Sequence, residues 1–112
     1  MARTALTVQQ IVRSGSGKAV TYATPGTQHS IPSNDGRVFL HIINTGTTHT
    51  LTVQTPGEVA GLAVADPTAT LTATTGNQMV GPFEPAIFNQ SDGAVYIDFE
   101  AITGMTVAVL RL

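Results

Sequence analysis

The three histidines are the first residues of this chain to test for chemistry, because imidazole is the commonest metal ligand in proteins. They are His29, His41 and His49, and the chain has no cysteine that could complete a zinc site. If residues 45–48 form a four-residue hairpin loop, His41 and His49 fall on opposite faces of the sheet and cannot share an ion. We therefore expect no metal site, and interpret the histidines as surface residues or as residues with hydrogen-bond partners inside the fold.

Among the carboxylates, Asp98 and Glu100 stand two positions apart. In a strand this spacing puts them on one face, about 6.6 Å apart, a separation that suits the acid and base of an inverting glycosidase. Such pairs usually come from different strands that flank a cleft, so a solvated strand face is the simpler interpretation. Asp35 and Asp92 each precede a glycine, a pattern typical of turns in which the aspartate binds the backbone. We expect no enzymatic activity and no cofactor.

Charged residues are scarce in this chain. They make up 11% of it, against roughly 25% in an ordinary soluble domain, and eighteen threonines and eleven glycines take their place. Threonine fits a pleated, half-buried surface, because its branched Cβ stiffens the side chain while its hydroxyl tolerates water. So few charges leave much of the surface either neutral or covered by neighbours. The composition therefore predicts an all-β building block that packs into something larger.

Charge and hydropathy also exclude several classes of partner. The net charge is −2 and the five basic residues are spread along the chain, so no basic patch is predicted and we expect no nucleic-acid partner. No run of apolar residues is long enough to span a membrane, and we expect no membrane partner. The N-terminal sequence lacks the apolar stretch of a secretory signal, so we expect synthesis in the cytoplasm. The length predicts one domain over residues 1–112.

Alternation of apolar and polar residues predicts about eight short strands. The candidate segments are residues 6–12, 18–22, 37–44, 49–55, 68–74, 78–80, 86–88, 94–100 and 105–112, with residues 28–31 ambiguous. Turn signals recur about every ten residues, among them the Ser-Gly-Ser-Gly stretch at 14–17. The pattern predicts a single antiparallel β-sandwich, with jelly-roll or immunoglobulin-like connectivity.

The segments 37–44 and 49–55 are predicted to pair as a hairpin, which leaves an unusual outer surface. One face of this hairpin would carry the core residues Leu40, Ile42, Leu51 and Val53. The other face, and the second face of the last strand, carry more apolar surface than solvent should see. We therefore predict an interface with another layer or subunit, made by Phe39, His41, Ile43, Leu110 and Leu112.

Several stretches of the chain are familiar in combination. They are Asn34-Asp35-Gly36-Arg37 running into Val38-Phe39-Leu40-His41, then Gly61-Leu62-Ala63-Val64, Gly81-Pro82-Phe83, Phe88-Asn89-Gln90-Ser91-Asp92-Gly93, Val95-Tyr96-Ile97-Asp98-Phe99 and the closing Val107-Ala108-Val109-Leu110-Arg111-Leu112. Over nearly the whole chain, this set resembles a family of small structural proteins encoded by tailed bacteriophages and prophages.

The resemblance implies a virion component, most simply a decoration (cement) protein on the outer surface of the capsid. Its partners would be the lattice of the major capsid protein and further copies of itself, with a trimer as one option. The family has no catalytic motif, so no site residues are carried over. Two alternatives stay open: a tail or head–tail connector component, which should form a closed ring, and a surface-displayed carbohydrate- or receptor-binding module, which should show an aromatic cluster around a groove.

Overall fold

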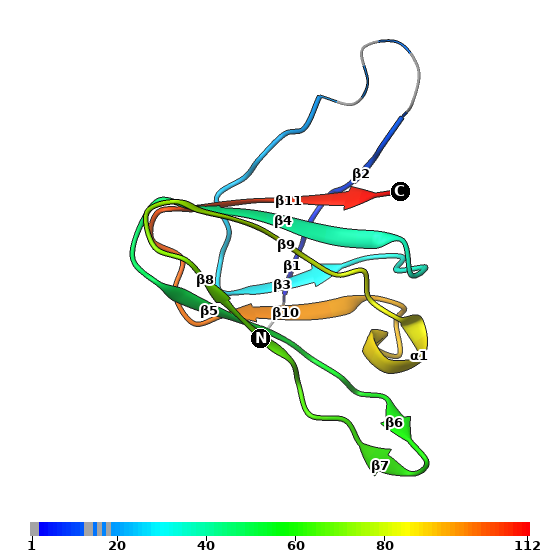
Figure 1. The fold of residues 1–112 in the computed structure, drawn as a ribbon. Helices are drawn as coiled ribbons and strands as arrows, with labels where there is room; N and C mark the ends of the chain where they lie inside the picture. The colour runs from blue at the N-terminus through cyan, green and yellow to red at the C-terminus, as the bar shows by residue number, and fades with distance from the viewer. Residues whose placement is uncertain (1–2, 13–14, 16, 18) are drawn as a thin grey trace.

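Two β-sheets pack face to face in the computed structural model of this chain, which describes residues 3–12, 15, 17 and 19–112 (Figure 1). The first sheet contains, in order, β1 (Thr4–Ala5), β3 (Gln28–Ile31), β10 (Val95–Phe99), β5 (His49–Val53) and β8 (Thr68–Leu71). The second contains β2 (Val8–Gln10), β11 (Met105–Arg111), β4 (Val38–Asn44) and β9 (Gly76–Val80). A separate hairpin joins β6 (Glu58–Val59) to β7 (Leu62–Ala63), and α1 (Pro85–Phe88) is a single helical turn. The predicted all-β class is confirmed.

The core lies between the two sheets, and every long strand contributes alternate residues to it. In β4 the inward positions are Val38, Leu40 and Ile42, each at most 1% exposed. The inward residues of the other long strands are Ile31, Leu51, Val53, Leu71, Val95, Ile97, Phe99, Met105, Val107 and Val109. The four residues predicted to share a core face, Leu40, Ile42, Leu51 and Val53, are all buried. Alternation therefore identified the inward side of these strands correctly.

The predicted hairpin between β4 and β5 is wrong. β4 pairs with β11 and β9, whereas β5 pairs with β10 and β8, so residues 45–48 cross from one sheet to the other. The buried Asn44 holds this crossing, because its Nδ2 donates to the carbonyl oxygen of Thr47 (2.8 Å) and its Oδ1 accepts from the N–H of Gly46 (3.0 Å). A Cβ on Gly46 would lie 2.5 Å from the carbonyl oxygen of Thr103, so a larger residue would force the backbone apart.

The N-terminal segment makes both sheets mixed, so the prediction of a purely antiparallel sandwich is also wrong. β1 runs parallel to β3 in the first sheet, and β2 runs parallel to β11 in the second. The segment thus passes from one sheet to the other along one open side of the sandwich. Beside it, Ala23 forms an isolated antiparallel bridge to Val107. All other pairings between the strands are antiparallel.

Several smaller predictions also differ from the structure. Residues 86–88, predicted as a strand, belong to the helix α1, in which Pro85 occupies the first turn, where its missing N–H costs nothing. Residues 19–22 of the predicted strand 18–22 form no strand, and residue 18 lies outside the described residues. The predicted turn at 14–17 also lies partly outside them. The ambiguous segment 28–31 is the strand β3, and the hairpin β6–β7 was not predicted.

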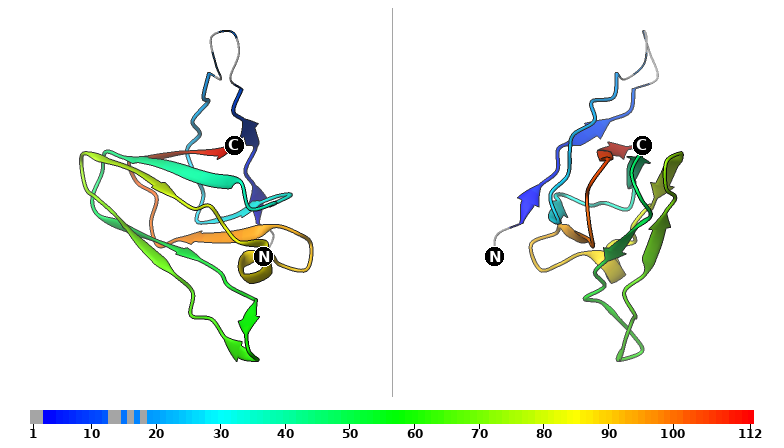
Figure 2. Two further views of the ribbon diagram at one scale, coloured as in Figure 1. Left: turned by 45° about the vertical axis from the view of Figure 1, so that its right-hand side comes forward. Right: turned by 90° about the vertical axis from the view of Figure 1, so that its left-hand side faces the viewer.

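Two segments project from the sandwich in different directions (Figure 2). One, which we call the arm, contains residues 11–12, after the end of β2, and residues 19–23, and the other is the β6–β7 hairpin. The hairpin turns at Ala60 and Gly61, which both have positive φ (54° and 79°), as a two-residue hairpin turn requires. Both projections carry exposed apolar side chains: Ile11, Val12 and Val20 on the arm, and Leu62, 71% exposed, on the hairpin.

Candidate interaction surface

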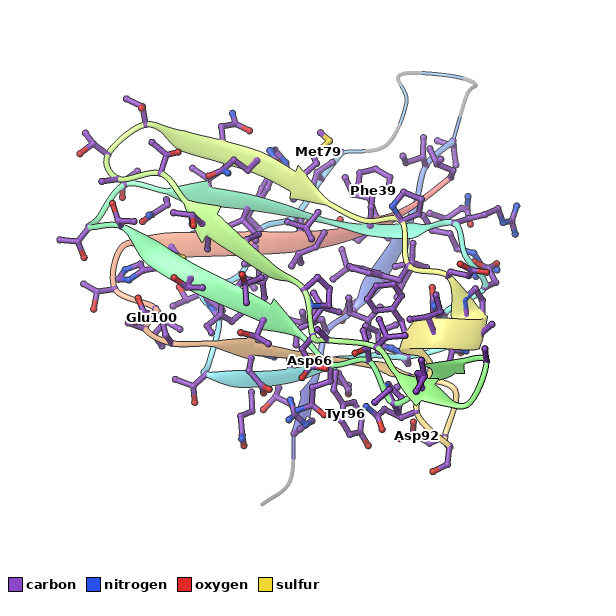
Figure 3. The ribbon with its side chains drawn as sticks, turned by 60° about the horizontal axis from the view of Figure 1, so that its bottom comes forward. Phe39, Asp66, Met79, Asp92, Tyr96 and Glu100 are labelled. Carbon is purple, nitrogen blue, oxygen red and sulfur yellow. The ribbon has the colours of Figure 1, made fainter. Side chains whose placement is uncertain are left out.

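The outer face of the second sheet gathers most of the residues predicted to form an interface. The β4–β11 register pairs Phe39 with Leu110 and His41 with Ala108, and the β4–β9 register pairs His41 with Met79. These pairs lie on the side of the sheet away from the core. Figure 3 shows Phe39 and Met79 along β4 and β9, far from Tyr96 and Asp92. The structure thus brings Phe39, His41, Ile43 and Leu110 together, and Leu112 follows at the end of β11.

Only part of this group is accessible to a partner. Phe39 and Ile43 are half-buried, and Leu112 is 62% exposed. His41 and Leu110, at 9% and 6%, are already covered by the chain itself and offer little contact area. Met79, which was not predicted from the sequence as an interface residue, is 66% exposed beside His41. We call Phe39, Ile43, Met79 and Leu112 the apolar face. The sequence carried no signal for Met79, because the segment Gly76–Val80 does not alternate apolar and polar residues.

His41 serves a structural purpose at the centre of this surface. Its Nδ1 lies 2.6 Å from the hydroxyl of Tyr22, and its Nε2 is hydrogen-bonded to Oδ1 of Asn77. Because an amide oxygen only accepts, Nε2 donates the hydrogen bond to Asn77. The Tyr22 ring also packs edge-on against His41, with the ring centroids 5.4 Å apart. His41 therefore fastens residues 19–24 to the outer face of the second sheet.

The other two histidines are likewise satisfied within the fold. The Nε2 of His29 accepts from the N–H of Gly26 (2.8 Å), and its Nδ1 lies 3.0 Å from the carbonyl oxygen of Thr4. The Nε2 of His49 lies 3.0 Å from the carbonyl oxygen of Thr103. Within residues 3–12, 15, 17 and 19–112, no group of three or more His, Cys, Asp or Glu side chains could hold a metal ion.

The outer face of the first sheet is polar. Thr50 lies opposite Thr70 and Thr52 opposite Thr68 in the β5–β8 register, and none of these four side chains is buried. We call them the threonine face. Beside it, β10 carries Tyr96 and Asp98 on the same side of the sheet, paired with Ser30 and Gln28 of β3. Hydroxyl and amide groups thus cover this sheet, whereas the outer side of the other sheet adds the apolar side chains of Phe39, Ile43 and Met79 to its polar groups.

The neighbours of Asp98 stabilise its ionised carboxylate. Its Oδ1 accepts from Arg3 (2.7 Å) and its Oδ2 accepts from Nε2 of Gln54 (2.8 Å). Partial burial raises the pKa of Asp98, but the hydrogen bonds from Arg3 and Gln54 outweigh it and bring the pKa below its ordinary value. Glu100 instead points toward His49, whose Nδ1 is 3.6 Å away. The two carboxylates therefore have separate partners and do not face each other across a cleft.

The two turn aspartates behave as the sequence predicts. The Oδ1 of Asp35 accepts from the N–H of Arg37, and Oδ1 of Asp92 accepts from the N–H of Ala94. Asp35 also pairs with Arg37 and Arg111, and despite an opposing desolvation effect these contacts lower its pKa. Asp92 accepts from the hydroxyl of Tyr96, and this bond raises the pKa of the tyrosine.

The aromatic side chains do not assemble around an open groove in the part of the chain that the structure describes. Phe83 and Phe88 line a cavity of about 200 Å³ between the ends of β8 and β9, with Val53 and Val80, but Phe83 is only 2% exposed. Tyr22 lies over the second sheet, whereas Tyr96 lies on the first. A carbohydrate-binding module would need stacking surfaces that face one ligand.

Comparisons with known proteins leave these residues as the only guide to function. No family model, curated protein or solved structure matches the chain. Among the described residues, no helix is both long and apolar enough to cross a membrane.

Proposed function

We propose that this chain is a structural virion protein of a tailed bacteriophage, a decoration protein that binds the outer surface of the capsid and stabilises it. It would act through contact area, with the lattice of the major capsid protein and sister copies as partners. The observation that carries the proposal is the asymmetry of the two outer faces. An apolar face suits contact with a shell or a sister subunit, and a neutral threonine face suits water.

The exposed apolar side chains support the same function. Among the side chains that the structure describes, the large ones are Ile11, Val12, Val20, Leu62, Met79 and Leu112. They lie at the two projections and at the apolar face, and none lies on the threonine face. A subunit that contacts several neighbours in a shell needs such separated contacts. Because it binds the assembled shell, each bound copy stabilises that shell by mass action.

We further infer jelly-roll connectivity. In an immunoglobulin-like sandwich several successive strands stay in one sheet. Here the chain changes sheet at β1–β2, β2–β3, β3–β4, β4–β5, β8–β9, β9–β10 and β10–β11. Within the two packed sheets of the described chain, only β5 and β8 follow each other as neighbours in one sheet, with the small β6–β7 hairpin between them. The strand order is β3-β10-β5-β8 in one sheet and β11-β4-β9 in the sheet that faces it. This order supports two interlocked Greek keys, which is the jelly-roll arrangement. A tail or connector component is the second candidate, but no observation on the described residues favours it.

The test compares purified heads with and without the protein. Heads lacking it should rupture at lower temperature, and the protein should be present at many copies per head. Equal rupture temperatures, or about a dozen copies at one vertex, as a ring at a single portal would supply, would reject decoration and favour the connector.

A matched pair of variants locates the contact. Met79→Asp should weaken binding to heads by about 10- to 100-fold, because burial of a side chain of this size stabilises by about 1.5–3 kcal/mol. Thr70→Asp puts the same charge at an exposed position on the threonine face and should bind as the unaltered protein does. Equal losses for both variants would contradict the assignment of the apolar face.

A further inference from the structure

The N-terminal segment is joined to the body of the molecule in an unusual way. Residues 3–10, which we call the strap, contain β1 and β2 and run along one open side of the sandwich (Figure 2). β1 pairs with β3 through two residues, and β2 pairs with β11 through three. Both pairings are parallel, so no tight turn ties the strap to either neighbour. The strap is therefore held to the body by its strand pairing and its side-chain contacts, and not by a connecting turn.

The packing beneath the strap is loose. A groove of about 480 Å³ lies on one side, between the strap and residues that include Thr21, Ala23 and His29. A second groove, of about 460 Å³, lies between the strap and the segment Pro32–Ser33 with Arg111. Leu6 and Val8 are only partly buried and pack against the edge of a core formed by other strands. The body therefore keeps its central core without the strap.

The contacts that the strap does make are specific. Arg3 donates to the carbonyl oxygens of His29 (3.3 Å) and Ile97 (3.2 Å) and to Asp98, and its guanidinium lies 4.5 Å from the ring centroid of Tyr96. The N–H of Leu6 donates to the carbonyl oxygen of Ser30 (2.9 Å). All of these partners belong to β3 and β10, not to the strap. The body thus presents a formed receptor for this segment.

We propose that the strap is an exchangeable strand, which in an oligomer occupies the same receptor on a second copy of this chain. Every contact described above would be re-formed between two copies, so the exchange replaces contacts without losing any. Residues 11–21 connect the strap to Tyr22, which stays bound to His41, and could span about 36 Å when extended. That reach is comparable to the longest dimension of the molecule, 43 Å. A neighbouring copy in contact is therefore within range.

Concentration decides which arrangement forms. A short connection holds the strap near its own receptor at an effective concentration in the millimolar range. In dilute solution, each strap should therefore occupy the receptor of its own chain. When copies are crowded together in an assembly, the straps should exchange between neighbouring copies. The inference concerns only contacts between copies of this chain, so it can fail or hold independently of capsid binding.

The experiment uses disulfide bonds, since the natural chain has no cysteine. The variant Ala5→Cys/Ser30→Cys joins register partners of the strap and its receptor. It is unfolded, refolded under reducing conditions at about 10 µM and at about 2 mM, values on either side of the expected effective concentration, and then oxidised. On a denaturing gel without reductant we expect monomers from the dilute sample and covalent dimers or larger species from the concentrated one.

Two further variants make the result decisive. Thr52→Cys/Thr68→Cys joins register partners within the body and should stay monomeric at both concentrations. Gln10→Cys/Arg111→Cys reports on the β2–β11 end of the strap and replaces the first variant if circular dichroism shows that the first does not fold. Disulfides within single chains at every concentration overturn the proposal. Equal dimer yields from the strap pairs and the body pair also overturn it, because they indicate random collision.

Discussion

The outer faces of the two sheets differ although both belong to one sandwich of similar strands. The threonine face presents the hydroxyls of four side chains from β5 and β8. The apolar face presents Phe39 and Ile43 of β4 with Met79 of β9 and the terminal Leu112. A sheet that packs on one side only alternates apolar and polar residues, as β5 does; β4 has large apolar residues on both sides. This difference is the basis of the proposal that the second sheet meets a partner.

The chemistry of the two faces makes burial favourable for one of them and nearly neutral for the other. A threonine hydroxyl keeps its hydrogen bonds to water, so the threonine face gains little from burial. Each Å² of apolar area removed from water stabilises by about 25 cal/mol. Polar groups near the threonine face also satisfy one another, as Arg3, Asp98 and Gln54 do. Three further predictions test this comparison.

The largest effect should separate the core from the apolar face on one strand. Ile42→Ala should lower the free energy of unfolding by about 2–5 kcal/mol, because it opens a cavity in a packed core. Ile43→Ala, its half-buried neighbour, should cost about 1 kcal/mol in the isolated chain. Urea unfolding of both variants measures the difference. Equal losses would mean that the outer side of β4 is core as well.

Self-association should depend on the apolar face more than on the threonine face. Phe39→Ser should weaken association between copies by about 10- to 100-fold, from a lost burial of about 1.5–3 kcal/mol, with a small change in unfolding. Thr52→Ser is the control and should leave association unchanged. Sedimentation across a concentration series measures both. Should Phe39→Ser unfold the chain, Phe39 would belong to the core and the apolar face would lose its largest member.

The smallest effect concerns the ion pair beside the threonine face. The pKa of Asp98 is lower in the folded chain than its ordinary value, so its contribution to stability is present above about pH 4 and is lost as the pH falls through the folded pKa. Asp98→Asn should therefore cost about 1 kcal/mol or less near neutral pH, since the pair is partly exposed, and less than that at pH 2.

The control for this prediction is Glu100→Gln, at an exposed carboxylate on the same strand end. It should change stability by no more than about 0.5 kcal/mol at either pH. Urea unfolding at both pH values tests the pair of variants. If Asp98→Asn lowers the free energy of unfolding by the same amount at both pH values, the Arg3–Asp98 pair contributes no net electrostatic stabilisation.

The candidate interface could be predicted only in part. Alternation in β4 correctly placed Phe39, His41 and Ile43 on one side and Leu40 on the other. Exposure could not be predicted, because residues 19–24 cross this side and the Tyr22 hydroxyl binds His41. Met79 was missed for a related reason: the sequence does not say that β9 is the neighbour of β4 at the edge of its sheet.

The amino-acid pattern determined the strand class, most strand positions and the inward side of β4 and β5, because these depend on residues one and two positions apart. Tertiary structure decided the partners. Leu40, Ile42, Leu51 and Val53 were all assigned correctly to the core. However, the first two lie on β4 in one sheet, and the last two lie on β5 in the other sheet. The crossing at 45–48 depends on Asn44 and on the close approach of Gly46 to Thr103, a residue far along the chain. Alternation is a local property, whereas strand pairing is settled by contacts between distant residues.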